Sequence, residues 1–217
     1  MVARWLVWND MPKTQEGLAL LVEADGASAE VVEAFRNVAR SDFVPRQGRK
    51  EAYLDRPVAL PERQTTSQPS LIARMIDSLE LTPSDRVLEV GTGYGFQTAL
   101  LSNLAGEVHS IERHADLAEA ARANLTAAGI ESAHVEVGDG WKGLASAAPF
   151  DGIIVSAAAV RVPPSLVDQL VEGGRMVIPL AGSRGDEVVL FEKRRGVLRR
   201  VQLITPARFV PLVPGPP

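Results

Sequence analysis

The 217-residue chain contains no cysteine and only three histidines. The absence of cysteine excludes disulfides, thiolate metal sites and cysteine nucleophiles, and it fits a reducing compartment such as the cytoplasm. His109, His114 and His134 do not have the spacing of a metal site, and we interpret all three as structural or surface residues. Neither HExxH nor a G-x-S-x-G elbow occurs, so the sequence argues against a hydrolase.

Basic residues are fewer than acidic ones: the chain has 23 Lys and Arg against 27 Asp and Glu, which gives a formal net charge of -4. Affinity for nucleic acid rests largely on phosphate neutralisation by Lys and Arg, so we expect no nucleic-acid partner. The apolar run of the opening segment MVARWLVWNDMPK is too short for the apolar region of a signal peptide, and we expect no transmembrane segment. We expect a cytoplasmic monomer without a membrane partner, and we expect Trp5 and Trp8 to pack against its body.

In the central part of the chain, short apolar runs typical of strands alternate with segments whose apolar residues have helical spacing. Five expected strands lie at 86–90, 107–112, 134–137, 150–156 and 175–180, with expected helices at 96–105, 115–129 and 164–174. Strands separated by helices of this length need crossover connections and therefore run parallel. The pattern predicts a doubly wound α/β fold, a mostly parallel sheet with helices on both faces.

The two ends of the chain have other patterns. Helices are expected from Ser28 and from Pro69, and two runs at 187–194 and 197–204 predict an antiparallel hairpin. We interpret the basic clusters of this hairpin as a solvated face that protects an edge strand, and we expect the final PLVPGPP to be extended or disordered. The whole is one predicted domain: a helical layer over about 1–80, a core over about 81–180, and a hairpin with a tail over about 181–217.

The sequence EVGTGYG follows the first expected strand, at the position where open α/β sheets bind ligands. Gly91, Gly93 and Gly95 permit a sharp bend and the close approach of a ligand. Their spacing is neither that of the G-x-G-x-x-G dinucleotide fingerprint nor that of a phosphate loop. The turn therefore favours a ligand without a pyrophosphate, although a tight strand-to-helix connection explains it equally well.

Two acids follow neighbouring strands at places that suit an adenosine. Glu112 ends the second strand, 21 positions after Gly91, where an acid can accept the hydroxyls of a ribose. Asp139 follows the third strand and could reach an adenine amino group, although Asp-Gly is also a common turn pair. Together with Glu89 and the glycine turn for a charged amino acid moiety, these residues predict S-adenosylmethionine as the ligand.

The scarcity of general bases contrasts with a run of hydroxyls in RQTTSQPS, residues 63–70. A carboxylate acceptor is ionised at neutral pH, with an ordinary pKa of about 3.5 to 4, and needs no base to remove a proton. It needs alignment and loss of its water instead. A hydroxyl beside free N–H groups at a helix start can cradle such an anion. We expect Ser67 to position the acceptor, with Thr65 and Thr66 as walls, and Ser67 or Gln68 to cap the helix that begins near Pro69.

Seven segments resemble, in order, the motifs of the protein-L-isoaspartate O-methyltransferase family over residues 28 to 212. They are FVP (43–45), AYLDR (52–56), QTTSQP (64–69), VLEVGTGYGFQTA (87–99), GDGWKG (138–143), PFDGIIVSAAA (149–159) and QLVEGGRMVIPL (169–180). The segment QTTSQP is the specific one, since many methyltransferases have a glycine turn and few have this segment before it.

The resemblance implies a Rossmann-like methyltransferase fold and methyl transfer from S-adenosylmethionine to the α-carboxylate of an L-isoaspartyl residue, leaving S-adenosylhomocysteine. The ester then collapses to a succinimide, which hydrolyses partly to normal aspartate. The implied catalytic residue is Ser67. The implied cofactor-binding residues are Glu89, Gly91, Thr92, Gly93, Glu112, Asp139 and Gly140. The implied substrate-side residues are Thr65, Thr66, Ala157 and Ala158.

The chain departs from the family pattern at Arg63, Thr66 and Ser70, which all lie on the substrate side. These departures leave the methyl donor unchanged and bear on the choice of peptide. Three alternatives remain at this point: a carboxyl methyltransferase for one dedicated peptide, a module that binds the donor without catalysis, and RNA methylation through the basic hairpin. The net acidity argues against the last of these.

Overall fold

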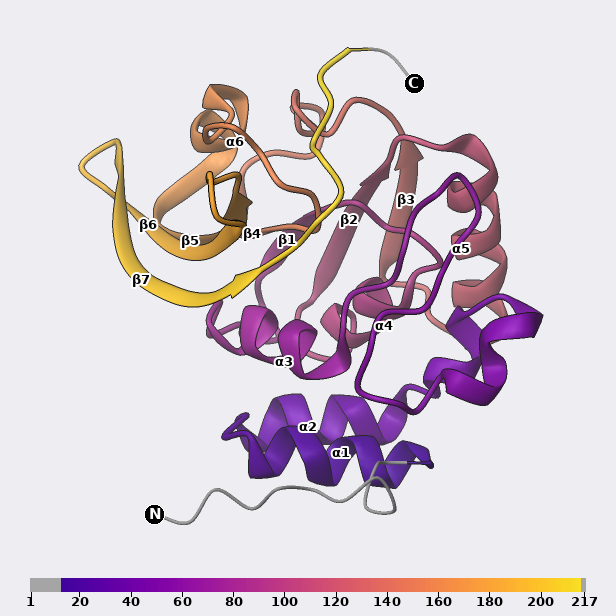
Figure 1. Cartoon of the computed structure of the whole chain (residues 1–217). Coiled ribbons are helices and arrows are strands. Elements are labelled where there is room, and N and C mark those ends of the chain that lie inside the picture. Colours follow the sequence, from indigo (N-terminus) through magenta and orange to yellow (C-terminus); the bar gives the residue numbers. More distant parts are fainter. Residues whose placement is uncertain (1–12, 216–217) are drawn as a thin grey trace.

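The computed structural model describes residues 13–215, which form one mixed sheet with helices packed on it (Figure 1). The strand order is β3-β2-β1-β4-β5-β6-β7. The strands are β1 (Arg86–Val90), β2 (Glu107–Glu112), β3 (Ala133–Val137), β4 (Phe150–Val155), β5 (Leu170–Leu180), β6 (Asp186–Arg194) and β7 (Val197–Ala207). The first five run parallel, and β6 and β7 are antiparallel.

The chain reverses its direction of winding at β1, which lies between β2 and β4. Val90 at the end of β1 pairs with Ile111 on one side and with Val155 on the other. The carboxyl ends of three strands therefore meet at one edge of the sheet, which is the place where such sheets bind ligands. The predicted doubly wound fold is confirmed.

One face of the sheet carries most of the helices (Figure 1). They are α1 (Gln15–Ala24), α2 (Ala29–Asn37), α3 (Pro69–Asp77), α4 (Phe96–Leu101) and α5 (Ala115–Ala127). Their apolar sides share a core with strand residues such as Val87, Val108 and Ile154, all fully buried. Burial of each such side chain contributes roughly 1.5–3 kcal/mol to folding, so this face anchors the strands that hold the ligand edge.

The other face is covered more thinly, by α6 (Pro164–Gln169) and by the connection at 138–149, which contains turns and no helix. The prediction of a helix over 164–174 is wrong in its second half. β5 begins at Leu170, and Gly173 has a φ of 82°, a conformation that ends a helix. The backbone from Leu170 onward instead joins the sheet, where Leu170 pairs with Phe150 of β4.

The N-terminal layer contains a helix that the sequence did not reveal. In α1 the hydroxyl of Thr14 accepts the N–H of Gly17, and Leu18 and Val22 are buried. Two 3-10 helices, η2 (Arg40–Phe43) and η3 (Arg46–Glu51), follow α2 and lead toward the ligand edge. The expectation for Trp5 and Trp8 lies outside the described residues.

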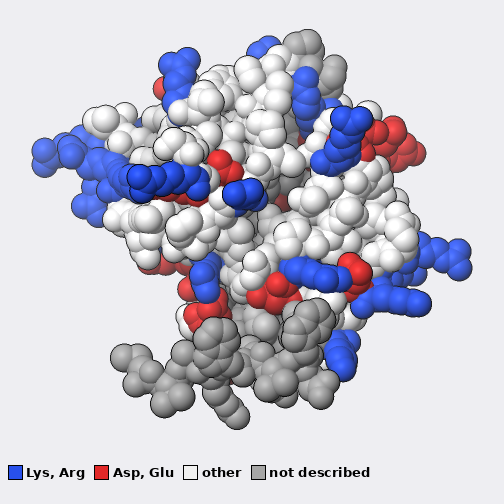
Figure 2. Space-filling view, in the orientation of Figure 1, with Lys and Arg blue, Asp and Glu red and all other residues white. Residues whose placement is uncertain are grey.

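The predicted hairpin is present as β6 and β7, and Lys and Arg side chains gather over it on the left of the surface in Figure 2. Arg194 and Arg200 there pair with Glu192 and Glu187 at 2.7 and 2.9 Å. This pattern of exposed pairs agrees with a solvated face. Within residues 13–215, no helix has the length and apolarity that a bilayer crossing requires.

The segment after β7 is extended and runs beside the residues that follow β4. The N–H of Ala158 donates to Val210 O at 2.8 Å, and the N–H of Leu212 donates back to Ala158 O at 2.7 Å. The tail is thereby fixed at the ligand edge as an additional parallel partner of the Ala157–Ala159 segment.

Candidate active site

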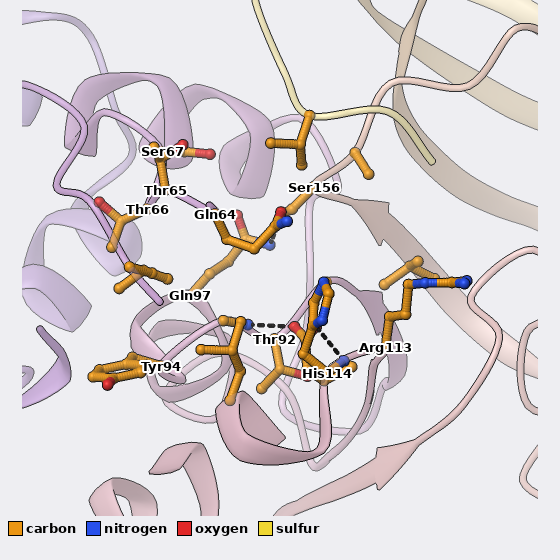
Figure 3. Close-up of a pocket in the computed structure, with 18 of the residues that line it drawn as sticks. Gln64, Thr65, Thr66, Ser67, Thr92, Tyr94, Gln97, Arg113, His114 and Ser156 are labelled. Atoms are coloured by element: carbon orange, nitrogen blue, oxygen red, sulfur yellow. Dashed lines mark hydrogen bonds between the residues drawn. The ribbon is translucent and has the colours of Figure 1, made fainter. Parts of the chain in front are cut away.

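A cavity of about 390 Å³ opens at the carboxyl ends of β1, β2 and β4 (Figure 3). Pockets that enclose small ligands typically measure about 300–1,000 Å³. Four stretches far apart in sequence form its walls: residues 63–67, 90–94, 111–114 and 210–213. The hydroxyl segment and the glycine turn therefore face one common space.

Most of the residues singled out from the sequence line this cavity: Ser67, Thr65, Thr66, Gly91, Thr92, Gly93, Glu112, Gly140 and Ala157. Three do not belong to its lining: Glu89, Asp139 and Ala158. The roles of all twelve stay predictions, but their placement separates those that can touch a ligand directly from those that act through a neighbour.

The hydroxyl segment ends at α3, and Pro69 occupies its first turn. The N-cap residue is Gln68, but its side chain makes no capping hydrogen bond, and Asp55 Oδ1 accepts the N–H of Ser70 at 2.9 Å instead. The prediction that the side chain of Ser67 or Gln68 caps the helix is therefore wrong. The hydroxyls of Thr65 and half-buried Ser67 make no hydrogen bond within residues 13–215. Ser67 is consequently available to donate to a ligand in the cavity.

Thr66 differs from its neighbours because its hydroxyl oxygen is already bound. It accepts from the Nη2 of Arg40 at 2.8 Å and from the N–H of Val58 at 3.0 Å, and the residue is buried. Its contribution to the cavity is therefore its position in the wall rather than a free hydroxyl acceptor.

Arg40 is fully buried and holds the segment that carries Ser67. Besides Thr66, its guanidinium donates to four backbone carbonyls, those of Ala52, Leu54, Arg56 and Ser67, at 2.9 to 3.1 Å. Burial lowers the pKa of Arg40 to about 10, so it stays charged at neutral pH. No sequence pattern indicated this role, since Arg40 stands in a polar stretch typical of a surface.

The glycine turn brings backbone close to the space for a ligand. Gly91 has a φ of 96°, and a Cβ there would lie 3.3 Å from the Cβ of Ser156. A Cβ on Gly140 would lie 2.3 Å from Val90 Cγ1. Both positions require glycine, the first for its left-handed backbone and the second for close packing.

Glu112 connects the turn to the end of β2. Its Oε2 accepts the N–H of Gly93 at 2.8 Å, and its Oε1 accepts the N–H of His114 at 3.0 Å. A carboxylate oxygen has two acceptor sites, so each oxygen retains one. Glu112 can therefore accept two further hydroxyls, which is what a ribose offers.

Glu89 lies beneath the turn, fully buried, and reaches the cavity only through its partners. Gln97 Nε2 donates both to Glu89 Oε1 at 2.9 Å and to Ser156 Oγ at 3.0 Å. On the other oxygen, Thr98 and Ser110 donate at 2.5 and 2.6 Å, and Ser110 contacts Thr92. Burial raises the pKa of Glu89 to about 7, although these hydrogen bonds oppose the shift.

Asp139 is tied to the tail rather than directed at the cavity. Its Oδ1 accepts the N–H of Trp141 at 3.0 Å and its Oδ2 accepts the N–H of Gly215 at 2.9 Å. The Nη1 of Arg113 donates to the carbonyls of Val213 and Gly215, both at 3.1 Å. The tail thus forms a wall of the cavity that the sequence did not predict.

Other lining residues were also missed. His114 lines the cavity, although its sequence context suggested a structural or surface residue, and Ser156 faces the glycine turn. Gln97 is the one that left a signal, because a glutamine within the apolar run FQTALL is typical of a polar group with a buried partner.

Comparisons with known proteins agree with one another. A model of the family described as protein-L-isoaspartate(D-aspartate) O-methyltransferase matches residues 14–216. A protein-L-isoaspartate O-methyltransferase of Koribacter versatilis is 46% identical over 84% of this chain and 82% of its own length. One of Methanoculleus marisnigri is 42% identical over 92% of this chain and 90% of its own.

Solved structures show the same fold. A protein-L-isoaspartate O-methyltransferase superposes with a TM-score of 0.80 at 30% identity; the match covers 91% of this chain and 65% of that one. A structure from Plasmodium falciparum, solved with S-adenosyl-L-homocysteine, gives a TM-score of 0.78 at 23% identity and covers 92% and 98% of the two chains.

Replacement of Glu89 by glutamine is expected to change how stability depends on pH. Because the pKa of Glu89 is about 7 when folded and lies near 4.5 when unfolded, its stabilising contribution is complete below pH 4.5 and disappears as the pH rises through 7. Relative to Glu89→Gln, the wild-type free energy of unfolding should fall by roughly 2–3 kcal/mol between pH 5 and pH 8. Urea denaturation at several pH values measures the free energy of unfolding of both proteins. A wild-type value that rises relative to that of Glu89→Gln between pH 5 and pH 8 would contradict the raised pKa.

Removal of the Arg40 guanidinium by Arg40→Met is expected to destabilise the fold by at least about 3 kcal/mol, because buried carbonyls lose their donor. For a chain of this size this corresponds to a melting temperature roughly 6–12 °C lower. The control is Arg46→Met, which removes an exposed arginine of the same segment. Equal melting curves for the two variants would show that Arg40 does not hold the segment.

Proposed function

The chain belongs to the protein-L-isoaspartate(D-aspartate) O-methyltransferase family, and we propose that the cavity between the hydroxyl segment and the glycine turn is its active site. The protein is a methyltransferase that uses S-adenosylmethionine and acts on isoaspartyl residues of damaged proteins. The observation that carries the proposal is that Ser67, with a hydroxyl free of partners among the described residues, shares one cavity with the glycine turn.

The glycine-turn side is proposed to hold the methyl donor. Glu112 would accept the ribose hydroxyls with the acceptor sites left on its two oxygens. The turn itself, with Gly91, Thr92 and Gly93, would hold the amino acid moiety through backbone groups, and Gly140 would leave room beside the adenine. S-adenosylmethionine, when bound, supplies a methyl group on a positively charged sulfur, which an ionised carboxylate oxygen accepts without prior proton removal.

Glu89 and Asp139 take indirect parts in the proposal. Glu89 supports the turn through Gln97 and Ser110 rather than by touching the donor. Asp139 remains the proposed partner of the adenine amino group, and it would have to share its Oδ2 with the N–H of Gly215.

The hydroxyl-segment side is proposed to hold the acceptor. Ser67 would donate its O–H to one oxygen of the isoaspartyl α-carboxylate and leave the other oxygen directed at the methyl group. A hydrogen bond to an ionised group is stronger than one between neutral groups, and it fixes direction as well as position. Thr65 and Thr66 would form the wall beside the peptide, Ala157 would leave space for the carboxylate, and Ala158 would hold the tail in place.

Several further features belong to the proposal. The excess of acidic residues supports a protein that acts without nucleic acid, and the lack of cysteine supports a cytoplasmic location. We propose a monomer made of a single domain, with a helical layer, a donor-binding core and a hairpin with its tail. General repair is favoured over a dedicated peptide because the matching family and the curated relatives are described as protein-L-isoaspartate methyltransferases.

Ser67→Ala is expected to lower kcat about ten- to hundredfold, since a hydrogen bond to a charged group contributes about 1.5–3 kcal/mol. The Kd for S-adenosylhomocysteine should stay nearly unchanged because Ser67 faces the acceptor. Initial rates with an isoaspartyl peptide and titration calorimetry measure the two quantities.

The matched control for this variant is Ser146→Ala, which removes an exposed hydroxyl outside the cavity. The aspartyl version of the same peptide should be methylated by neither protein. A large loss of S-adenosylhomocysteine affinity in Ser67→Ala would assign the segment to the donor and contradict the proposal.

Glu112→Gln is expected to weaken binding of S-adenosylhomocysteine at least about tenfold, because the amide lacks the charge and one of the two acceptor oxygens. Calorimetry of the variant measures the Kd directly. Glu136→Gln, which changes an exposed glutamate of β3, is the control. An unchanged Kd in Glu112→Gln would exclude the ribose role.

A further inference from the structure

A second, smaller cavity of about 100 Å³ adjoins the active site at the hydroxyl segment. The two cavities have five lining residues in common: Thr65, Thr66, Ser67, Ser156 and Val210. None of the glycine turn lines the smaller one, whose other walls come from 57, 68, 71 and 208–209. Ser67 therefore lies between the larger cavity, which has room for the methyl donor, and the smaller cavity, which has room for only one or two side-chain groups.

The smaller cavity has one charged lining residue, Arg208. Arg208 is exposed and makes no ion pair or side-chain hydrogen bond with any residue of 13–215. Some exposed arginines have a carboxylate partner, as Arg74 has in Asp25 at 2.6 Å, whereas Arg208 has none among residues 13–215. The charge of Arg208 is thus uncompensated beside the acceptor position.

The backbone that carries Arg208 is fixed on both sides. β7 ends at Ala207, the N–H of Phe209 donates to Asp186 Oδ2 at 2.7 Å, and Val210 O accepts the N–H of Ala158 at 2.8 Å. Asp186, an acid close to this segment, is therefore engaged by a backbone donor. The guanidinium extends from a held position and offers a planar fork that suits a carboxylate.

We propose that Arg208 and the smaller cavity form a subsite for a carboxylate of the substrate peptide, an Asp or Glu side chain close to the isoaspartyl residue. The inference rests on the proposed active site, because it takes Ser67 as the acceptor position. With the larger cavity filled by the donor, a peptide reaches Ser67 from the side of the smaller one. An acidic neighbour on that peptide then meets the unpaired guanidinium.

The test uses isoaspartyl peptides that are identical except for Glu or Gln at each of the two positions before and after the isoaspartyl residue. The wild-type enzyme should prefer Glu to Gln at one position by about three- to fivefold in kcat/KM, the size expected for an exposed charge pair. In Arg208→Gln this ratio should fall to about 1, and in Arg208→Glu it should fall below 1. Added salt should reduce the wild-type preference, since exposed charges are screened.

Two other arginines make the test specific. Arg199→Gln, an exposed change on β7 outside both cavities, should leave rates and ratio as in the wild type. Arg63 lines only the larger cavity and is likewise exposed, so Arg63→Gln should keep the ratio. A preference that follows Arg63 instead of Arg208, or that persists in Arg208→Gln, overturns the subsite.

Methylation of the isoaspartyl peptide that has Gln at the flanking positions distinguishes a failure of the subsite from a failure of the proposed active site. If the wild type methylates it and shows no acidic preference at any position, the subsite is wrong and the active site stands. If the wild type methylates none of the peptides, the active-site assignment fails and the subsite fails with it.

Discussion

The proposed acceptor side of the cavity depends on one buried cation, Arg40. The stretches 52–56 and 66–67 have no long helix or strand of their own, and their carbonyls would be left without partners on burial. Arg40 gathers four of these carbonyls and one hydroxyl around a single guanidinium, which also lies 5.6 Å from the ring centroid of Phe96. Because Phe96 begins α4 directly after the glycine turn, the same cation links the acceptor segment to the donor side.

Different interactions therefore position the two proposed sides of the cavity. The donor side follows from sheet topology: the register of β1 with β2 and β4 brings Gly91, Glu112 and Ser156 to one edge, and buried Glu89 braces the turn from below. The acceptor side follows from a network of side-chain bonds to irregular backbone. A change in the sheet would displace the proposed donor site, whereas a change at Arg40 would act first on the proposed acceptor segment.

This division explains how much of the molecule was predictable from the sequence. The strands β1 and β2 were predicted to the residue because short apolar runs between turn signals define them, and the glycine turn follows from them. α1 was missed although Thr14 is an N-cap residue and Leu18 and Val22 have helical spacing. The end of α6 was wrong because pairing with β4 outweighed a helical pattern. Arg40 and the tail could not be predicted, since their importance arises from contacts between residues distant in sequence. The roles of the individual site residues remain proposals.

The tail also sets the order in which the site is completed during synthesis. The cavity is lined from Phe43 to Val213, and its last wall is held by the bonds of Ala158 to the tail. A nascent chain that ends at β5 already contains Ser67, the glycine turn and Glu112, yet it has no residues to close this wall. Domains fold as they emerge from the ribosome, so the core of the sheet can form before the cavity has its final shape. The cavity therefore has all its walls only after residues up to Val213 have been synthesised.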